Sequence, residues 1–129
     1  MKTSVRFAAS VLIAGVSVAV VATQAAPKAK YTTEEVMKTL HKGKDSIGKH
    51  VMDGNGTKEE IKKLLEYYPS MLLNDPEKGD KAEWKKRVTA LIAATKALDK
   101  GAPGAQDQFK EAVNCKACHS AHKPDKEHK

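Results

Sequence analysis

The chain has 129 residues, enough for one small domain, and a formal net charge of +7. Lysine and glutamate are interleaved along it, which is typical of solvated helix faces and argues against a nucleic-acid-binding surface. Its two cysteines are three positions apart, so they do not form the kind of disulfide framework that joins distant segments.

The N-terminal segment has the organisation of a secretory signal peptide. Lys2 and Arg6 precede an apolar run over residues 7–22, and small residues follow it. We expect cleavage after Ala25, with a cut after Ala22 as the alternative. An uncleaved membrane anchor is the competing interpretation, but the run is short for a span and rich in alanine, serine and glycine.

The expected domain organisation is a signal peptide over residues 1–25 and one mature domain over 26–129. Removal of the two N-terminal cations lowers the net charge from +7 to +5. About a hundred residues remain, which suffices for a small helical core. We expect the core over residues 31–122, a polar tail over 123–129, and a periplasmic location without membrane insertion after cleavage.

The first helical stretch is expected to begin at a capping box formed by Thr32 and Glu35. Apolar residues then recur at helical spacing as far as the turn at 53–56, so we expect one continuous helix. This apolar stripe consists of Val36, Leu40, Ile47 and Val51.

The second stretch is expected to begin at Thr57, whose partner in a capping box is Glu60. Pro69 is expected to end or kink this helix, with residues 70–73 forming a further turn. A loop over residues 74–79 follows.

The third and fourth stretches complete the mature domain. The third begins at Asp80, and the fourth runs from Ala105 through the cysteine pair to His122. No segment shows sustained period-two alternation, so the expected fold class is all-α, an antiparallel up-down-up-down four-helix bundle. The stripe of the third stretch consists of Trp84, Val88, Leu91, Thr95 and Leu98.

Residues 115–119 have the sequence Cys-Lys-Ala-Cys-His, the C-x-x-C-H pattern of covalent heme attachment. On a helix, Cys115 and His119 share a face because they are four positions apart. Two thiols can then reach the two vinyl groups of one porphyrin edge while the imidazole approaches the iron. We expect one covalent heme c, attached through Cys115 and Cys118, with His119 as the proximal iron ligand.

Two other kinds of chemistry use a similar spacing. A thioredoxin-type dithiol requires a βαβ pattern, which this sequence lacks. A zinc or copper site is the second, because His122 and His128 follow the motif. Structural zinc would need further ligands from upstream, where His41 and His50 are the histidines available. A Cys/His metal-binding module is therefore the less favoured alternative.

A C-x-x-C-H motif in the last helix of an exported four-helix chain resembles the class II cytochromes c. This family comprises cytochrome c-prime and its low-spin, methionine-ligated relatives. The likeness covers residues 31–122, and it implies that the family's attachment cysteines and proximal histidine correspond to Cys115, Cys118 and His119. The chain departs from the family in lacking an arginine in the first helix and in adding His122 and a polar tail.

The resemblance also implies a sixth iron ligand from the first helix, where Met37 is the candidate. Met37 lies beside the apolar stripe, so a core-filling role is the competing interpretation. If Met37 does not bind, the iron is five-coordinate and Leu40 is expected to line an apolar distal pocket. His41, one turn beyond Met37 but further from the stripe, is the remaining candidate, and Met52 and Met71 are weaker ones.

Other side chains could approach a heme. We expect His41 and His50 to be exposed surface histidines and Trp84 to be buried in the core. Heme propionates usually face a cation or solvent, and the sequence does not choose among the basic candidates. These are Lys38, Lys44, Lys85 and Arg87.

The expected function is one-electron transfer by a periplasmic mono-heme cytochrome, not an enzyme activity. An excess of lysine favours acidic redox protein partners through long-range steering. The resemblance implies that a homodimer can form. The main alternative is a five-coordinate heme protein that binds nitric oxide or carbon monoxide.

Overall fold

The computed structural model describes residues 27–125. The expected signal peptide, its cleavage site and His128 lie outside the described residues. Within residues 27–125 the chain forms helices and no strand, which confirms the all-α prediction. The six helices of this part are α1 (Thr33–Leu40), α2 (Ile47–Met52), α3 (Lys58–Leu73), α4 (Lys81–Asp99), α5 (Ala105–Ala112) and α6 (Cys115–His122).

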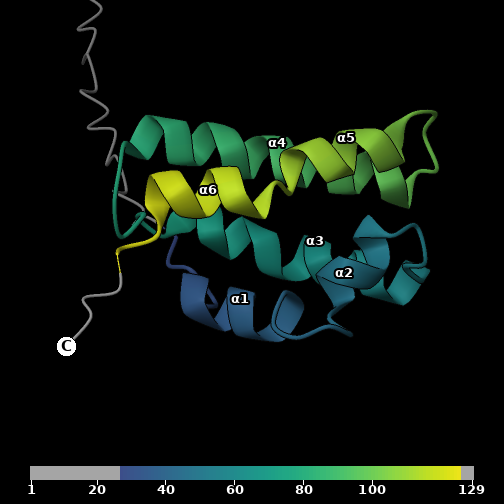
Figure 1. The fold of residues 1–129 in the computed structure, drawn as a ribbon, viewed down its shortest axis with the longest axis horizontal. Helices are drawn as coiled ribbons and strands as arrows, with labels where there is room; N and C mark the ends of the chain where they lie inside the picture. Colours follow the sequence, from purple (N-terminus) through teal and green to yellow (C-terminus); the bar gives the residue numbers. More distant parts are fainter. Residues whose placement is uncertain (1–26, 126–129) are drawn as a thin grey trace, which may run out of the picture.

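The helices pack as a bundle around α3 and α4 (Figure 1). Helices α1 and α2 lie against α3, while α5 lies against α4 and also contacts α2. Helix α6 continues the line of α5 (Figure 1) but makes few close backbone contacts with the other helices of the described part. The helix that carries the cysteine pair is therefore the least tightly packed of the six.

The expected first helix is divided into two. Helix α1 begins at the expected capping box of Thr32 and Glu35 but ends at Leu40. After the turn around Gly43, the Ser46 hydroxyl accepts a hydrogen bond from the Lys49 N–H and begins α2. The prediction of one continuous helix was wrong because this second cap starts a new helix within the apolar stripe.

Helix α3 begins at the expected capping box of Thr57 and Glu60. It continues through Pro69 to Leu73, so the expected end at the proline was wrong, whereas the further turn after it is present. Proline removes one backbone hydrogen bond from the helix. Tyr68 and Met71, which flank it, are 0 % and 2 % exposed, and their burial stabilises the helical conformation across this point.

Helix α4 has the apolar face that the sequence predicts. Asp80 caps it, with its carboxylate accepting a hydrogen bond from the Glu83 N–H. Trp84, Val88 and Leu91 are buried, as is Thr95, whose hydroxyl donates to the Leu91 carbonyl oxygen at 2.7 Å. Of the described helices, α4 contributes the most buried residues.

The expected fourth helix is also divided into two. Helix α5 ends at Ala112, and the side chain of Asn114 accepts a hydrogen bond from the Ala117 N–H at 3.1 Å to begin α6. The cysteine pair therefore lies on a separate short helix. The core cluster of the described residues draws its buried members from α1 to α5 and from Val113, and Cys118 packs against its edge.

None of the helices in residues 27–125 is long and apolar enough to cross a membrane.

Candidate functional site

Two neighbouring cavities lie beside α6, and they share four lining residues from three helices. Their volumes are about 330 Å³ and about 260 Å³. Together they fall within the range of about 300–1,000 Å³ that small-molecule and cofactor sites occupy. The shared lining residues are Met37 from α1, Met71 from α3, and Cys118 and His119 from α6.

Helix α6 presents the C-x-x-C-H side chains to these cavities. Cys118 and His119 border both, and Cys115 borders the second. Neither cysteine forms a disulfide. Partial burial raises the pKa of the Cys118 thiol, with the thiol of Cys115 adding to the effect and Arg87 opposing it. The motif thus brings two thiols and one imidazole to the same space from one helix.

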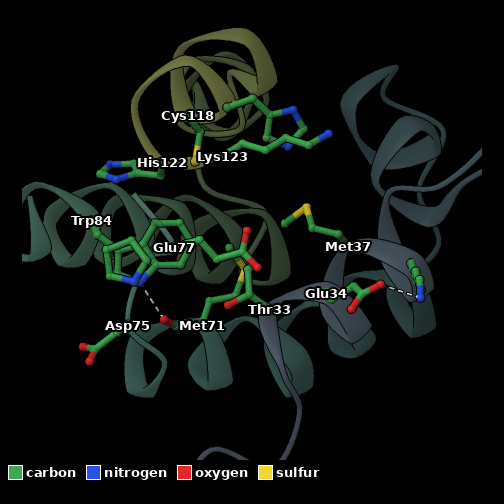
Figure 2. Close-up of a pocket in the computed structure, with 13 residues that line it drawn as sticks. Thr33, Glu34, Met37, Met71, Asp75, Glu77, Trp84, Cys118, His122 and Lys123 are labelled. Atoms are coloured by element: carbon green, nitrogen blue, oxygen red, sulfur yellow. Dashed lines mark hydrogen bonds and ion pairs between the residues drawn. The ribbon is translucent and has the colours of Figure 1, made fainter. Parts of the chain in front are cut away.

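Met37 faces α6 from the opposite side of the first cavity. Its half-buried side chain extends into the cavity from α1, and Cys118 extends into it from α6 (Figure 2). Met71 also borders both cavities but is 2 % exposed and belongs to the core. Met52 and Leu40 border neither of the two, and Leu40 is fully buried in the core.

His41 is not the exposed histidine that the sequence suggests. Its Nε2 lies 3.0 Å from the hydroxyl of the fully buried Tyr68, and its ring stacks on that of Tyr68. A Cβ at position 48 would fall 2.3 Å from His41 Nδ1, so Gly48 is what allows the ring to lie against α2. Burial, and to a lesser degree the charge of His119, lowers the pKa of His41 to about 4.

His122 is also buried, at 4 % exposure, and borders the first cavity. Its Nδ1 lies 3.0 Å from the Lys78 carbonyl oxygen. Sequence reasoning treated this residue only as a metal ligand and missed its burial. Its place on α6, one turn after His119, was the available signal.

Trp84 is buried as predicted and forms one wall of the first cavity (Figure 2). Its indole N–H donates to the carbonyl oxygens of Met71 and Asn74 at 2.8 and 3.1 Å. The satisfied indole holds the residue at the point where α3, α4 and the loop between them meet.

Two of the four basic candidates lie at the cavities. Lys38 borders the first and forms an ion pair with Glu34 at 2.6 Å, whereas Arg87 borders the second and pairs with Glu83 at 2.6 Å. Lys44 and Lys85 border neither of these cavities.

His50 is partly exposed, and its Nδ1 lies 2.9 Å from the Glu60 carboxylate, away from both cavities. Within residues 27–125, no three histidine, cysteine or acidic side chains gather so that they could hold a metal ion.

Comparison with models of protein families, with curated proteins and with solved structures finds no match to this chain.

Proposed function

We propose that this chain is an exported mono-heme c-type cytochrome that carries single electrons in the periplasm. The observation that carries the proposal is the gathering of Cys118, His119 and Met37 around two adjoining cavities. Each cysteine thiol would add across one heme vinyl group, forming a carbon–sulfur bond while its hydrogen passes to the neighbouring vinyl carbon. His119 would then bind the iron from the α6 side.

Met37 is the proposed sixth ligand. It borders both cavities together with His119, although it belongs to the opposite side of the bundle. Thioether sulfur is a suitable axial donor to heme iron. Met71 of α3 borders the same cavities, but its side chain is buried in the hydrophobic core, so core packing is sufficient to explain its position.

The proposed architecture is the up-down-up-down four-helix bundle of the class II cytochromes c. In this proposal α1 with α2 forms the first arm, α3 the second, α4 the third, and α5 with α6 the fourth. The packing of α3 on α1, α2 and α4, and of α5 on α4, supports this grouping. The breaks within the first and fourth arms would leave α1 and α6 free to adjust around a heme.

The proposed protein is an electron carrier and not an enzyme. Its net positive charge supports acidic redox protein partners, and the resemblance to class II cytochromes supports a homodimer. The apolar surroundings and the axial ligands would set the reduction potential.

A five-coordinate heme that binds nitric oxide or carbon monoxide is the second candidate. The observation that favours it is the cavity of about 260 Å³ beside His119. Val88, Leu91 and Val113 form much of its apolar wall, which would admit small neutral gases more readily than anions.

Heme staining of a denaturing gel tests the main proposal. Expressed with a heme-attachment system, the wild-type chain is expected to give a coloured band at the mass of the monomer. The Cys115→Ala/Cys118→Ala double variant should give none, and Lys116→Ala, which alters a variable position of the motif and keeps both cysteines and His119, should keep the colour. A colourless wild-type band would refute the proposal.

A further inference from the structure

The two ring nitrogens of His122 have different environments. Nδ1 lies 3.0 Å from the Lys78 carbonyl oxygen, and because a carbonyl oxygen can only accept, Nδ1 carries a proton and donates it. Nε2 is buried and has no hydrogen-bond partner among residues 27–125. A buried polar atom without a partner is unfavourable, and such atoms often mark the place of a bound molecule.

The ring cannot readily turn to find another partner. Its plane meets that of Trp84 edge-on, with ring centroids 5.2 Å apart and an interplanar angle of 74°. The loop before α4 also lies close to the ring, because a Cβ at position 79 would fall 3.0 Å from His122 Nδ1 and 2.4 Å from the Ala121 carbonyl oxygen. Trp84, the loop and the Nδ1 hydrogen bond therefore hold Nε2 in one position.

His122 also borders the first cavity, together with Met37, Cys118 and His119 (Figure 2). A molecule that fills this cavity therefore lies against the His122 ring. A carboxyl group matches Nε2 in either protonation state. A carboxylic acid donates its O–H to a neutral ring, and a carboxylate accepts from a doubly protonated one. Heme carries two such groups, its propionates.

The charged residues at the cavity are compatible with one added carboxylate. Two of its acids already have cationic partners: Glu34 pairs with Lys38, and Asp75 pairs with Lys81. Lys123 also borders the cavity and is exposed. Glu77 is the remaining acid there, and the lining also contains Thr33, whose buried hydroxyl has no hydrogen-bond partner among residues 27–125.

We propose that His122 Nε2 binds a heme propionate in the first cavity, while Nδ1 fixes the ring through the Lys78 carbonyl. This inference rests on the proposed heme function and adds a carboxylate-binding residue from the attachment helix itself. The residue acts on the propionate and not on the iron.

Two variants of the heme-bound protein separate the roles of the two nitrogens. In His122→Asn the amide can still donate to the Lys78 carbonyl, but nothing reaches the position of Nε2. In His122→Gln the amide reaches the position of Nε2 and can donate to a propionate, but the bond to Lys78 is lost. Circular dichroism checks that each variant retains its helices.

Infrared difference spectra of heme labelled with ¹³C at its propionates provide the direct measurement. The carboxylate band is expected to shift in His122→Asn and to stay near its wild-type position in His122→Gln. At a fixed ambient potential, the ratio of reduced to oxidised protein is expected to fall several-fold in His122→Asn, because an unneutralised propionate stabilises ferric iron.

An unchanged band in His122→Asn overturns this inference and leaves the cytochrome proposal intact, whereas a colourless heme stain of the wild type overturns both. A crystal structure of the heme-bound wild type decides the matter should His122→Asn lose its helices. A propionate oxygen about 3 Å from Nε2 supports the inference. A Glu77 carboxylate or a water in that place overturns it.

Discussion

At the scale of single residues, two pairs of side chains link α1 to distant parts of the chain. Met37 faces the cysteine-bearing helix across the first cavity, and His41 meets Tyr68 of α3. Met37 and His41, which caps the C-terminal end of α1, both border the second cavity and lie four positions apart. Substitution of Met37 should therefore change the optical spectrum of the heme, whereas substitution of His41 should change the free energy of unfolding.

Replacement of Met37 by alanine is expected to convert a low-spin heme to a high-spin one. If the methionine-bound state outweighs the open state by about tenfold, carbon monoxide should bind the reduced variant about tenfold more tightly than it binds the wild type. Met52 borders neither cavity, so Met52→Ala serves as the matched control. It should change neither the spin state nor the affinity for carbon monoxide. Optical spectra and carbon monoxide titration measure both effects. A wild type that is already high-spin, with no change in Met37→Ala, would favour the gas-binding candidate.

Stability is expected to fall as the pH drops from about 6.5 to 4, through His41. Burial lowers the pKa of His41 to about 4, so over this interval the unfolded chain binds a proton that the folded protein does not. The neutral ring is then present in the fold and shares a hydrogen bond with the Tyr68 hydroxyl. The loss should approach about 2 kcal/mol at pH 4, since each pKa unit corresponds to about 1.4 kcal/mol and partial exposure reduces the effect.

Urea unfolding at pH 7 and at pH 4.5 measures this difference. The double variant His41→Phe/Tyr68→Phe removes the titrating ring without leaving a buried hydroxyl unpaired, and it should lose most of the pH dependence. Tyr68→Phe alone keeps His41 and should retain it. If the free energy of unfolding falls by the same amount between pH 7 and pH 4.5 in the wild type and the double variant, the assignment to His41 is contradicted.

At the scale of helices, the starting points were more predictable than the interruptions. The caps at Thr32, Thr57 and Asp80 are local features, because one side chain and the next three residues form them. The breaks before α2 and before α6 also carry local caps, Ser46 and Asn114. These two breaks were not predicted because the apolar residues continue at helical spacing across them. Helices as short as α2 and α6 are stabilised by packing against their neighbours and not by their own length.

Asn114→Ala is expected to weaken α6 locally. Loss of an N-cap typically costs about 1 kcal/mol, which corresponds to about fivefold faster hydrogen exchange at the first amides of the helix. The mature chain produced without heme attachment is the sample, and the Ala117 amide is the reporter because Asn114 caps it. Asn114→Asp should preserve the cap and the wild-type exchange rate. Faster exchange in both variants would show that the effect is not capping.

At the scale of the whole molecule, the parts of the site that the sequence missed depend on long-range contacts. The C-x-x-C-H motif is continuous in sequence and could be recognised directly. The burial of His41 requires Tyr68, which is 27 positions away, and that of His122 requires Lys78, which is 44 positions away. Spacing along one helix carries no information about such partners, so exposure was predicted wrongly for His41.

Export and processing of the chain are a separate expectation at this scale. The intact mass of the purified protein should correspond to a chain that begins at Ala26 and carries one heme, because the apolar run and the small residues after it are typical of a cleaved signal peptide. Replacing Ala25 by a bulky residue such as Phe should slow the cleavage. Recovery of the wild-type chain with Met1 in the membrane fraction would contradict the prediction.

The small contribution of α6 to the buried core bears on how the proposed cytochrome would mature. The buried core of the described residues comes from α1 to α5 and Val113, so the bundle does not depend on the cysteine-bearing helix for most of its apolar burial. His122 connects the C-terminal end of α6 to the loop before α4 through the Lys78 carbonyl oxygen. In the proposed cytochrome, heme could therefore be attached to the two thiols of α6 after the core of the bundle has formed, without unfolding that core.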